Sequence, residues 1–492
     1  MGRWKDAVWV PELTAPGGRR ARERFAYRAF IPDQLDPAGL VFTAATSADL
    51  AEAEAAVAVA NHGQHLIAME TLSRLLLRSE SVASSRIEGL ECSQRRLAEA
   101  AFAPEHAGET ARQVLANIAA MRAAIELGTV DRDLRLDDIT RMHELLMRED
   151  RATGRHAGTL RTAQNWIGGR SDSPRDAAFV PPPPDQVVPL MHDLVGFINR
   201  DDLPVLAQAA IVHAQFETIH PFLDGNGRLG RCLIHTVLAR RQLASRILVP
   251  VSLVLAAYGD HYIEGLVDFR EGRVDQWCGL FASACQLALA GAARFEEQLA
   301  AMISRWRLEA PARPGSHLWR ACEQTTRTPV FTVATLCDEL GSSVTATTEA
   351  IERLAQIGVV AQVSLGRRNR VYLNRSVLRL LDDFERDLLT DADGKPGRLR
   401  TSARARTAIP AALLPSIEHA VLETFPLGTD APPETAAIAS LAGYRIDQVR
   451  PVLARLAGEE LLESTDNQRW ALTAKGRRLR EMIRTGEDLG PV

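Results

Sequence analysis

Residues 220–231 read HPFLDGNGRLGR and concentrate several reactive side-chain types in one short stretch. Gly225 and Gly227 permit positive φ, which lets successive backbone N–H groups converge on an anion. The helical pattern LGRCLIHTVLARR begins directly afterwards, so the N-terminus of that helix is expected to face the same anion. Arg228 and Arg231 are three residues apart and therefore share one helix face. This spacing favours the binding of a polyphosphate.

The remaining side chains of the stretch suit a magnesium-bound nucleotide. Asp224 provides a hard oxygen ligand for Mg²⁺, and Asn226 provides an uncharged donor beside the cradled phosphate. His220 is expected to titrate near neutrality, so that it can accept a proton from an incoming hydroxyl. A single one of these residues favours an ordinary solvated turn, whereas the combination favours a nucleotide site.

Two common motifs can be excluded. Gly230, with the two glycines before it, completes G-x-G-x-x-G, but the preceding segment has helical spacing and residues 231–256 contain no acid. A Rossmann dinucleotide site is therefore excluded. His143 begins H-E-x-x-H, but Met147 stands at the second histidine position, which excludes a zinc protease of that kind.

The composition is that of a folded chain with several domains. At 492 residues the chain is too long for one ordinary core, and two to four domains are expected. The formal net charge of −4 gives no global field that would attract nucleic acid or membrane. The six cysteines form no CxxC pair, and no apolar leader precedes the fold. We expect a cytoplasmic protein that makes no membrane contact.

Helical periodicity through most of residues 50–300 predicts a mostly α fold. The segment 160–184, LRTAQNWIGGRSDSPRDAAFVPPPP, predicts a hairpin that ends in a stiff polyproline stretch. Three short helical patterns followed by a hairpin, in residues 316–375, give the α+β order of a winged helix-turn-helix. The pattern recurs more weakly after an Arg-rich segment with Gly and Pro.

HPFLDGNGRLGR matches HxFx(D/E)GNGRxxR at every specified position and resembles the signature of the Fic (filamentation-induced-by-cAMP) family. AQFETIH before it, the segment 160–184, and YGDHYIEGLVDFREGRVDQW after it also look like parts of this family, over about residues 60–290. The resemblance implies an all-helical Fic core with a small β-hairpin flap. It also implies a protein adenylyltransferase, which moves AMP from ATP, with Mg²⁺, to a Ser, Thr or Tyr hydroxyl of a protein.

The resemblance further implies a role for each residue of the signature. His220 would be the general base that deprotonates the target hydroxyl. Asp224 would hold Mg²⁺ between the α and β phosphates. Asn226 and the Gly225–Gly227 backbone would bind the α phosphate. Arg228 would bind the β phosphate, and Arg231 would bind the γ phosphate.

An inhibitory pattern lies upstream. SSRIEG, residues 84–89, matches the family's [S/T]xxxE[G/N] motif with Ser84, Glu88 and Gly89. The resemblance implies that Glu88 pairs with Arg231 and withholds its guanidinium from the γ phosphate. The same glutamate helps to remove AMP in some relatives, so a reverse or other nucleotidyl transfer stays open.

The predicted hairpin resembles the family's target-clamping flap, with Gln164, Trp166, Ile167 and Gly168 at its centre. An extended peptide could pair with its edge and present a hydroxyl to His220. A buried Trp that merely pins the hairpin is an equally good and compatible interpretation.

The predicted domains are residues 1–60, an N-terminal segment on the core; 61–310, the Fic domain with its inhibitory helix near 80–90; 315–375, a winged helix; 376–410, a linker; and 411–485, a second winged-helix-like domain. The rival hypothesis is an ATP-sensing regulator that binds DNA through these units, with a wing tip at residues 366–370. The helix before that wing is poor in base-reading residues, which slightly favours protein docking or dimerisation. Self-modification and a homodimer stay open.

Overall fold

The computed structural model describes residues 2–10, 24–65, 67–102, 107–151, 153–169, 173–313, 315–364 and 370–389. In the C-terminal part it describes residues 435, 438, 453, 457, 462–466 and 469–473. The chain divides into two compact units, Met1–Ala405 and Arg406–Val492.

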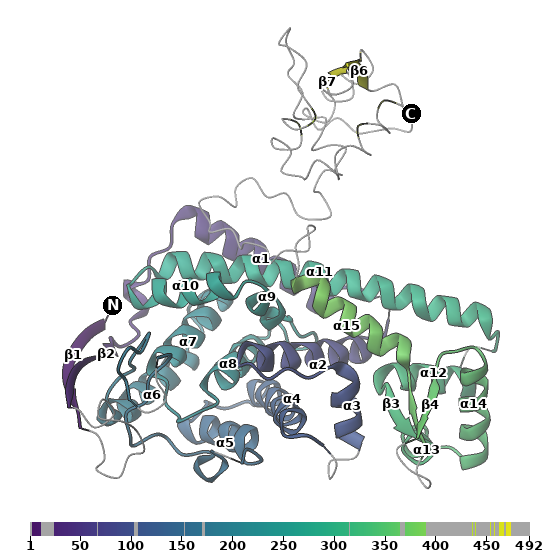
Figure 1. Ribbon diagram of the computed structural model, residues 1–492, viewed down its shortest axis with the longest axis horizontal. Coiled ribbons are helices and arrows are strands. Elements are labelled where there is room, and N and C mark those ends of the chain that lie inside the picture. The colour runs from purple at the N-terminus through teal and green to yellow at the C-terminus, as the bar shows by residue number, and fades with distance from the viewer. Residues whose placement is uncertain are drawn as a thin grey trace. The chain divides into compact units, whose positions relative to one another are not determined.

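The core of the first unit is helical, which confirms the predicted mostly α fold (Figure 1). Its helices are α1 (Ala44–His62), α2 (Met69–Ile87), α3 (Gln94–Phe102), α4 (Glu109–Gly128), α5 (Leu136–Met147), α6 (Pro184–Ile198), α7 (Val205–Ile219), α8 (Asn226–Arg240), α9 (Val251–Ala257), α10 (Gly259–Arg270) and α11 (Val274–Glu309). Short 3₁₀ turns lie at Pro37–Gly39 and Gly154–His156.

Helices α7 and α8 lie at the centre of this core. Every residue from Leu206 to Ile219 is buried, and so is every residue from Asn226 to Ala239. The two helices pack against each other, and α4 packs against α8. A helix that is buried all round must be enclosed by other helices, and its ends are therefore held rigidly.

Helix α11 has the length and apolar composition of a membrane span, and 67% of its most apolar window is buried inside the protein. It packs against α1, α7, α9 and α10. Thr43, which caps α1, is bound to α11 through its backbone N–H and Asp275 Oδ1 at 2.7 Å. Burial against other helices accounts for the apolar composition of α11.

The N-terminal strands β1 (Gly2–Trp9) and β2 (Phe25–Pro32) form an antiparallel pair in which Gly2 faces Pro32. The second half of β2 is buried, with Phe30 only 5% exposed. The Phe30 N–H donates to Val180 O at 2.9 Å, which joins this hairpin to the segment before α6.

Residues 317–373 contain three helices and three short strands. These are α12 (His317–Arg327), β3 (Val330–Thr332), α13 (Val333–Leu340), α14 (Val344–Gln356), β4 (Ala361–Ser364) and β5 (Arg370–Leu373). The strands form one antiparallel sheet in the order β3-β5-β4. The predicted helices and hairpin are present, while the wing-tip residues 366–369 lie outside the described residues.

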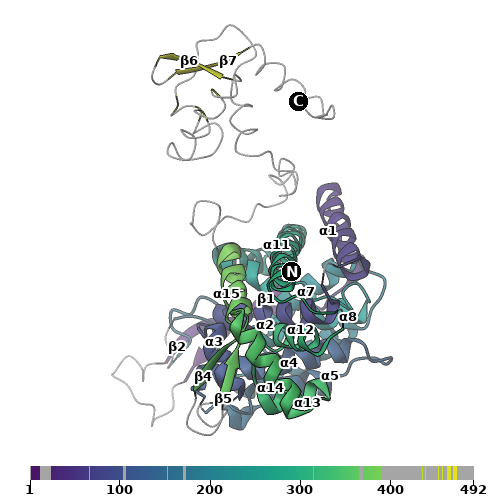
Figure 2. The ribbon, with the colours of Figure 1, turned by 90° about the vertical axis from the view of Figure 1, so that its right-hand side faces the viewer.

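The predicted linker at 376–410 is wrong in its first part. Residues Arg375–Leu389 form α15, which packs against α11, α9, α2 and α3 (Figure 2). Val377 and Leu381 are fully buried on this helix, and the Phe384 ring lies 4.9 Å from that of Phe295 in α11. The apolar face of α15 therefore packs on the first unit. The Arg-rich residues that follow α15 in the sequence made the whole segment look like a linker. Residues 390–410 lie outside the described residues.

In the second unit the described strands are β6 (Leu462–Asp466) and β7 (Arg469–Leu472), which form an antiparallel pair. The segment IDQVRPVLARLAGEELLES has helical periodicity that predicts a helix through Ser464, but Leu462–Ser464 belong to β6, so that prediction is wrong at its end. The segment RWALTAKGRRL reads as a strand that enters a helix, and its first four residues, RWAL, form β7. Most of the predicted domain at 411–485 lies outside the described residues.

Candidate active site

Residues 220–231, here called the catalytic loop after the role predicted for them, run from the end of α7 into the first turns of α8. Both junctions are left-handed: His220 has φ 49° and Gly225 has φ 76°. A Cβ on Gly225 would lie 2.7 Å from the Met147 Sδ, so a side chain is excluded by space as well as by φ. The two left-handed residues reverse the chain tightly and aim the N-terminus of α8 at the bend.

The loop is anchored by two residues that sequence reasoning did not select. Arg161 is 3% exposed; its Nε donates to His220 O at 2.8 Å and its Nη2 donates to Pro182 O at 2.6 Å. Asn165 Nδ2 donates to Phe222 O at 2.9 Å. Both lie in the RTAQNW segment, for which the sequence predicts only a flap. The sequence signal that could have identified them is a polar side chain in a stretch rich in proline and turns.

Asn226 has a structural task that the sequence did not predict. Its side-chain amide forms two bonds to the backbone of Phe222: Oδ1 accepts from the N–H at 2.9 Å, and Nδ2 donates to the carbonyl at 2.9 Å. These bonds close the bend between Phe222 and Asn226, the first residue of α8. The side chain therefore shapes the loop, while its backbone lies at the start of α8.

His143, which the sequence offered only as half of a zinc motif, supports the loop from α5. Its ring stacks on Phe222 with centroids 3.7 Å apart. Its Nδ1 accepts from the Gly158 N–H at 2.9 Å, so Nε2 carries the proton and donates to Asp224 O at 3.0 Å. Burial lowers its pKa to about 4, and the ring is neutral.

Arg228 presents a buried cation whose hydrogen-bonding capacity is largely unused. Its residue exposure is 3%, and its Nε and Nη1 have no hydrogen-bond partner in the described part of the chain. The nearest carboxylate oxygen, on Asp224, is 4.0 Å from Nη2. Buried donors without partners are costly, so this guanidinium suits an anionic ligand that the chain does not itself supply.

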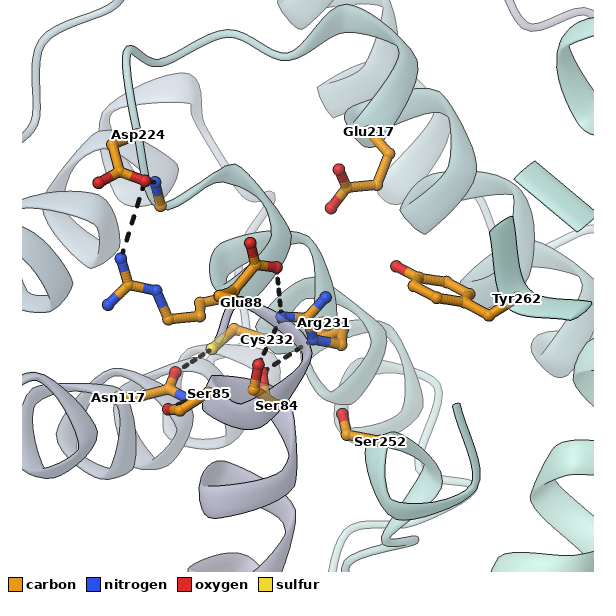
Figure 3. A network of polar contacts seen from close by, with 12 residues as sticks. Ser84, Ser85, Glu88, Asn117, Glu217, Asp224, Arg231, Cys232, Ser252 and Tyr262 are labelled. Atoms are coloured by element: carbon orange, nitrogen blue, oxygen red, sulfur yellow. Dashed lines mark hydrogen bonds and ion pairs between the residues drawn. The ribbon is translucent and has the colours of Figure 1, made fainter. Parts of the chain in front are cut away.

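Arg231 is bound by two residues of the predicted inhibitory motif. It is 1% exposed; its Nε donates to Ser84 Oγ at 2.9 Å, and its Nη2 donates to Ser84 O at 2.7 Å and to Glu88 Oε1 at 2.8 Å. Figure 3 shows Ser84 and Glu88 converging on this guanidinium from the end of α2. The pair that the resemblance implied is therefore present.

The Glu88 carboxylate lies where the sequence predicted an anion. A Cβ on Gly227 would lie 1.8 Å from Glu88 Oε1, so only a glycine leaves room for the carboxylate against the first turn of α8. Burial opposes ionisation of Glu88, but the charge and hydrogen bond of Arg231, with Arg228 and His220, lower its pKa overall. An anion at a helix N-terminus, between two arginines, is the expected electrostatic arrangement.

A buried network holds α2 in this position. Glu80 is fully buried and its Oε1 lies 2.9 Å from His235 Nε2 of α8. Its Oε2 accepts from the Ser252 N–H of α9 at 2.8 Å. A second tie comes from α15, where Glu385 Oε2 accepts from Arg86 Nη2 at 2.8 Å. The end of α2 is thus bound to three other helices.

His220 differs from its predicted titration. Burial, followed by the charge of Arg161, lowers its pKa to about 4, so the expectation of a pKa near neutrality is wrong. The ring is neutral at pH 7 and can still accept a proton. Its neighbour Glu217, whose Oε2 is 3.7 Å from His220 Nδ1, has a pKa raised to about 7 by burial and then by Glu88.

Comparison with known proteins agrees with this geometry. Residues 133–238, which include the catalytic loop, match the Fic/DOC family, and residues 47–126, which include the predicted inhibitory motif, match the Fic/DOC family N-terminal region. This part of the chain belongs to the Fic/DOC family.

Protein adenylyltransferase fic-1 of Caenorhabditis elegans is 28% identical over 141 residues, which are 28% of this chain and 25% of that protein. Probable protein adenylyltransferase aq_aa38 of Aquifex aeolicus (strain VF5) is 35% identical over 99 residues, which are 20% of this chain and 28% of that protein. The similarity therefore spans about a quarter of these relatives' length. A Fic family protein from Desulfovibrio desulfuricans G20 has a TM-score of 0.42 at 20% identity, over 68% of this chain and 97% of that one.

The hairpin predicted in residues 160–184 is represented by a single strand pairing. Among the described residues of this segment, the only strand pairing is the antiparallel bridge between Ile167 and Phe179. Gln164 Nε2 donates to Pro181 O at 3.0 Å, and Gly168 has φ 72°. Trp166 packs edge-on against Trp9 of β1, with centroids 5.4 Å apart. Trp166 therefore joins the N-terminal hairpin to the flap, and residues 170–172 lie outside the described residues.

The catalytic loop suits a magnesium ion that takes most of its ligands from a bound nucleotide and water. In the described ranges no group of three or more His, Cys, Asp or Glu side chains could hold a metal. The Asp224 side chain is 53% exposed and therefore accessible to a bound cation. Mg²⁺ is commonly held by one or two carboxylates together with phosphates and water, and Asp224 fits that pattern.

Proposed function

We propose that this protein transfers AMP from ATP to a hydroxyl side chain of a protein. The observation that carries the proposal is the anion position at the start of α8, where the glycine cradle of Gly227 and the buried guanidinium groups of Arg228 and Arg231 meet a carboxylate. The adenylyltransferase relatives support the same activity.

In this reaction His220 acts as the base. Its neutral ring takes the proton of the target hydroxyl while the hydroxyl oxygen bonds to the α phosphorus. The bond from that phosphorus to the bridging oxygen breaks, and pyrophosphate leaves. Arg161 fixes the backbone of His220 by its bond to the carbonyl, so the ring stays at one position during attack.

The phosphates are held by the start of α8 and its arginines. The backbone N–H groups around Gly227 and the unpartnered donors of Arg228 face the developing negative charge. Arg231 orients the terminal phosphate when Glu88 leaves it. Asp224 would hold Mg²⁺, which would neutralise charge between the α and β phosphates.

We propose that Glu88 is a built-in brake. Its carboxylate stands in the anion position and binds the guanidinium that the γ phosphate needs. ATP aligned for attack and Glu88 in this place exclude each other, because both require Arg231 and the same space. The closed arrangement thus has low activity, and displacement of the end of α2 starts the reaction.

We also propose that residues 317–373 are a winged helix used for protein docking. The order of α12, β3, α13, α14, β4 and β5 supports that architecture. In α14, the helix in the recognition position, Thr347 is fully buried and Glu349 is exposed and anionic. Such a surface disfavours DNA phosphates.

The six cysteines are free thiols, which supports a reducing, cytoplasmic location.

The test is mass spectrometry of a target-free reaction and of a lysate reaction. The Glu88→Gly chain is incubated with ATP and Mg²⁺, alone and with a protein extract, and masses are compared with those from Glu88→Gly/His220→Ala. Addition of one AMP residue to Ser, Thr or Tyr only with His220 present supports the proposal. ATP binding without AMP addition in either reaction rules the activity out.

A further inference from the structure

A separate cavity of about 340 Å³ lies between the Fic core and the α12–α14 unit. Its walls come from α2, α3 and α4 on one side and from the α12–β3 connection and α13 on the other. No residue of the catalytic loop lines it. Four of its lining residues are arginines and one is a glutamate: Arg74, Arg78, Arg122, Arg327 and Glu339.

The four arginines that line the cavity are paired with fewer carboxylates than would neutralise their charge. One carboxylate, Glu70, serves both Arg74 at 2.9 Å and Arg327 at 3.1 Å. Glu339 accepts instead from Gln324 Nε2 at 2.8 Å. Cationic groups that converge on one space repel each other unless an anion lies between them.

The other two arginines are not neutralised by contact. Arg78 donates from Nη2 to Gln94 O at 2.8 Å and from Nε to the Gln94 side chain, so both bonds go to neutral groups. Burial lowers the pKa of Arg78 to about 10, and the charge of Glu385 behind it opposes this change. Arg122 forms no ion pair within the described ranges. Arg78 and Arg122 therefore leave cationic charge at the cavity wall.

The rest of the lining is largely apolar. Leu75 is 1% exposed, Ala98 is 2% exposed and Val330 is 7% exposed, and Ile118 is partly buried beside them. A guanidinium fork binds phosphate oxygens in pairs, while an apolar floor of this kind favours a flat or aliphatic group. The volume is that of a small-molecule site.

We propose that this cavity binds a small organic phosphate. Its phosphate would lie among Arg78, Arg122 and Arg327, and its carbon body would lie on Leu75 and Val330. Two of the lining arginines belong to α2, the helix that ends at Glu88, so the ligand contacts the same helix as the catalytic loop does.

The probe is phenyl phosphate, which carries no nucleobase. It is titrated into the full chain by calorimetry, in EDTA, beside inorganic phosphate and phenol. Saturable binding at one site, tighter for phenyl phosphate than for either fragment, is expected. Arg122→Gln should weaken it about tenfold, the effect of losing one charge-assisted hydrogen bond. Arg122 is exposed, so the variant is expected to fold; Arg96→Gln, an exposed arginine of α3 outside the cavity, should bind as the parent does.

Hydrogen exchange locates the site. Phenyl phosphate should protect residues 69–87 and 317–332. Protection confined to residues 220–231, equal affinity of Arg122→Gln and Arg96→Gln, or no saturable binding would overturn the proposal. So would Arg122-dependent binding of duplex DNA or a phosphopeptide without binding of phenyl phosphate. None of these results depends on AMP transfer, which is measured separately.

Discussion

The contact between Glu88 and Arg231 makes a quantitative prediction about ATP binding. Replacing Glu88 by Gly removes the carboxylate from the anion position and leaves Arg231 with its two bonds to Ser84. The buried guanidinium therefore keeps partners, and the variant is expected to fold. Its freed donors become available to the γ phosphate.

The size of the effect follows from the contact. A hydrogen bond to a charged group contributes about 1.5–3 kcal/mol. The Glu88 side chain is 37% exposed, so solvent screening places the 2.8 Å contact at the low end, at about 1.5 kcal/mol. Because ATP must displace this contact, its removal should lower the Kd for ATP about tenfold.

The assay is calorimetric titration with α,β-methylene-ATP and Mg²⁺, which avoids turnover. Glu88→Gln, which keeps the shape but loses the charge, should give an intermediate Kd. Glu91→Gln, an exposed carboxylate three residues further on, is the matched control and should bind as the parent does. If Glu88→Gly binds the analogue with the parent's affinity, the carboxylate does not compete with the phosphate and the brake is refuted.

Three further predictions concern the scaffold around the loop. Arg161→Gln should lower the free energy of unfolding by about 1–3 kcal/mol, since it removes the buried donor to the Pro182 carbonyl and leaves the His220 carbonyl with the 3.2 Å bond from Asn165 Nδ2; urea denaturation measures this. Glu385→Gln should weaken the tie to Arg86 at the end of α2 and raise the rate of labelled AMP incorporation severalfold; an unchanged rate would show that α15 does not hold the brake. Stability should fall as pH drops from 6.5 towards 4.5, because three buried histidines have lowered pKa values and the unfolded chain binds their protons first. They are His143, His213 and His220. Glu217, with its pKa raised to about 7, and Glu385, whose pKa burial also raises, oppose this change, so the fall in stability is smaller than the three histidines alone would give. A pH-independent urea midpoint would contradict these shifts.

The catalytic loop was predictable because its chemistry is local. Gly225 reaches φ 76°, as its place in the motif predicted, but the helix begins at Asn226, three residues before the predicted start at Leu229, so Gly227 lies in its first turn and has no positive φ. Arg228 and Arg231 lie on one buried helix face, as their three-residue spacing required. Sequence also predicted the pair of Glu88 with Arg231, because the inhibitory motif and the signature occur together.

What the sequence by itself determined was the local backbone: which segments are helical, where the loop bends, and which side chains it carries. Tertiary structure decided the rest, because contacts between distant residues depend on packing that no local pattern encodes. Arg161 reaches His220 across 59 positions, and Glu385 reaches Arg86 across 299, which turned an expected linker into part of the core. The pKa of His220 depends likewise on enclosure by neighbouring elements, since burial, not residue type, keeps its ring neutral down to about pH 4.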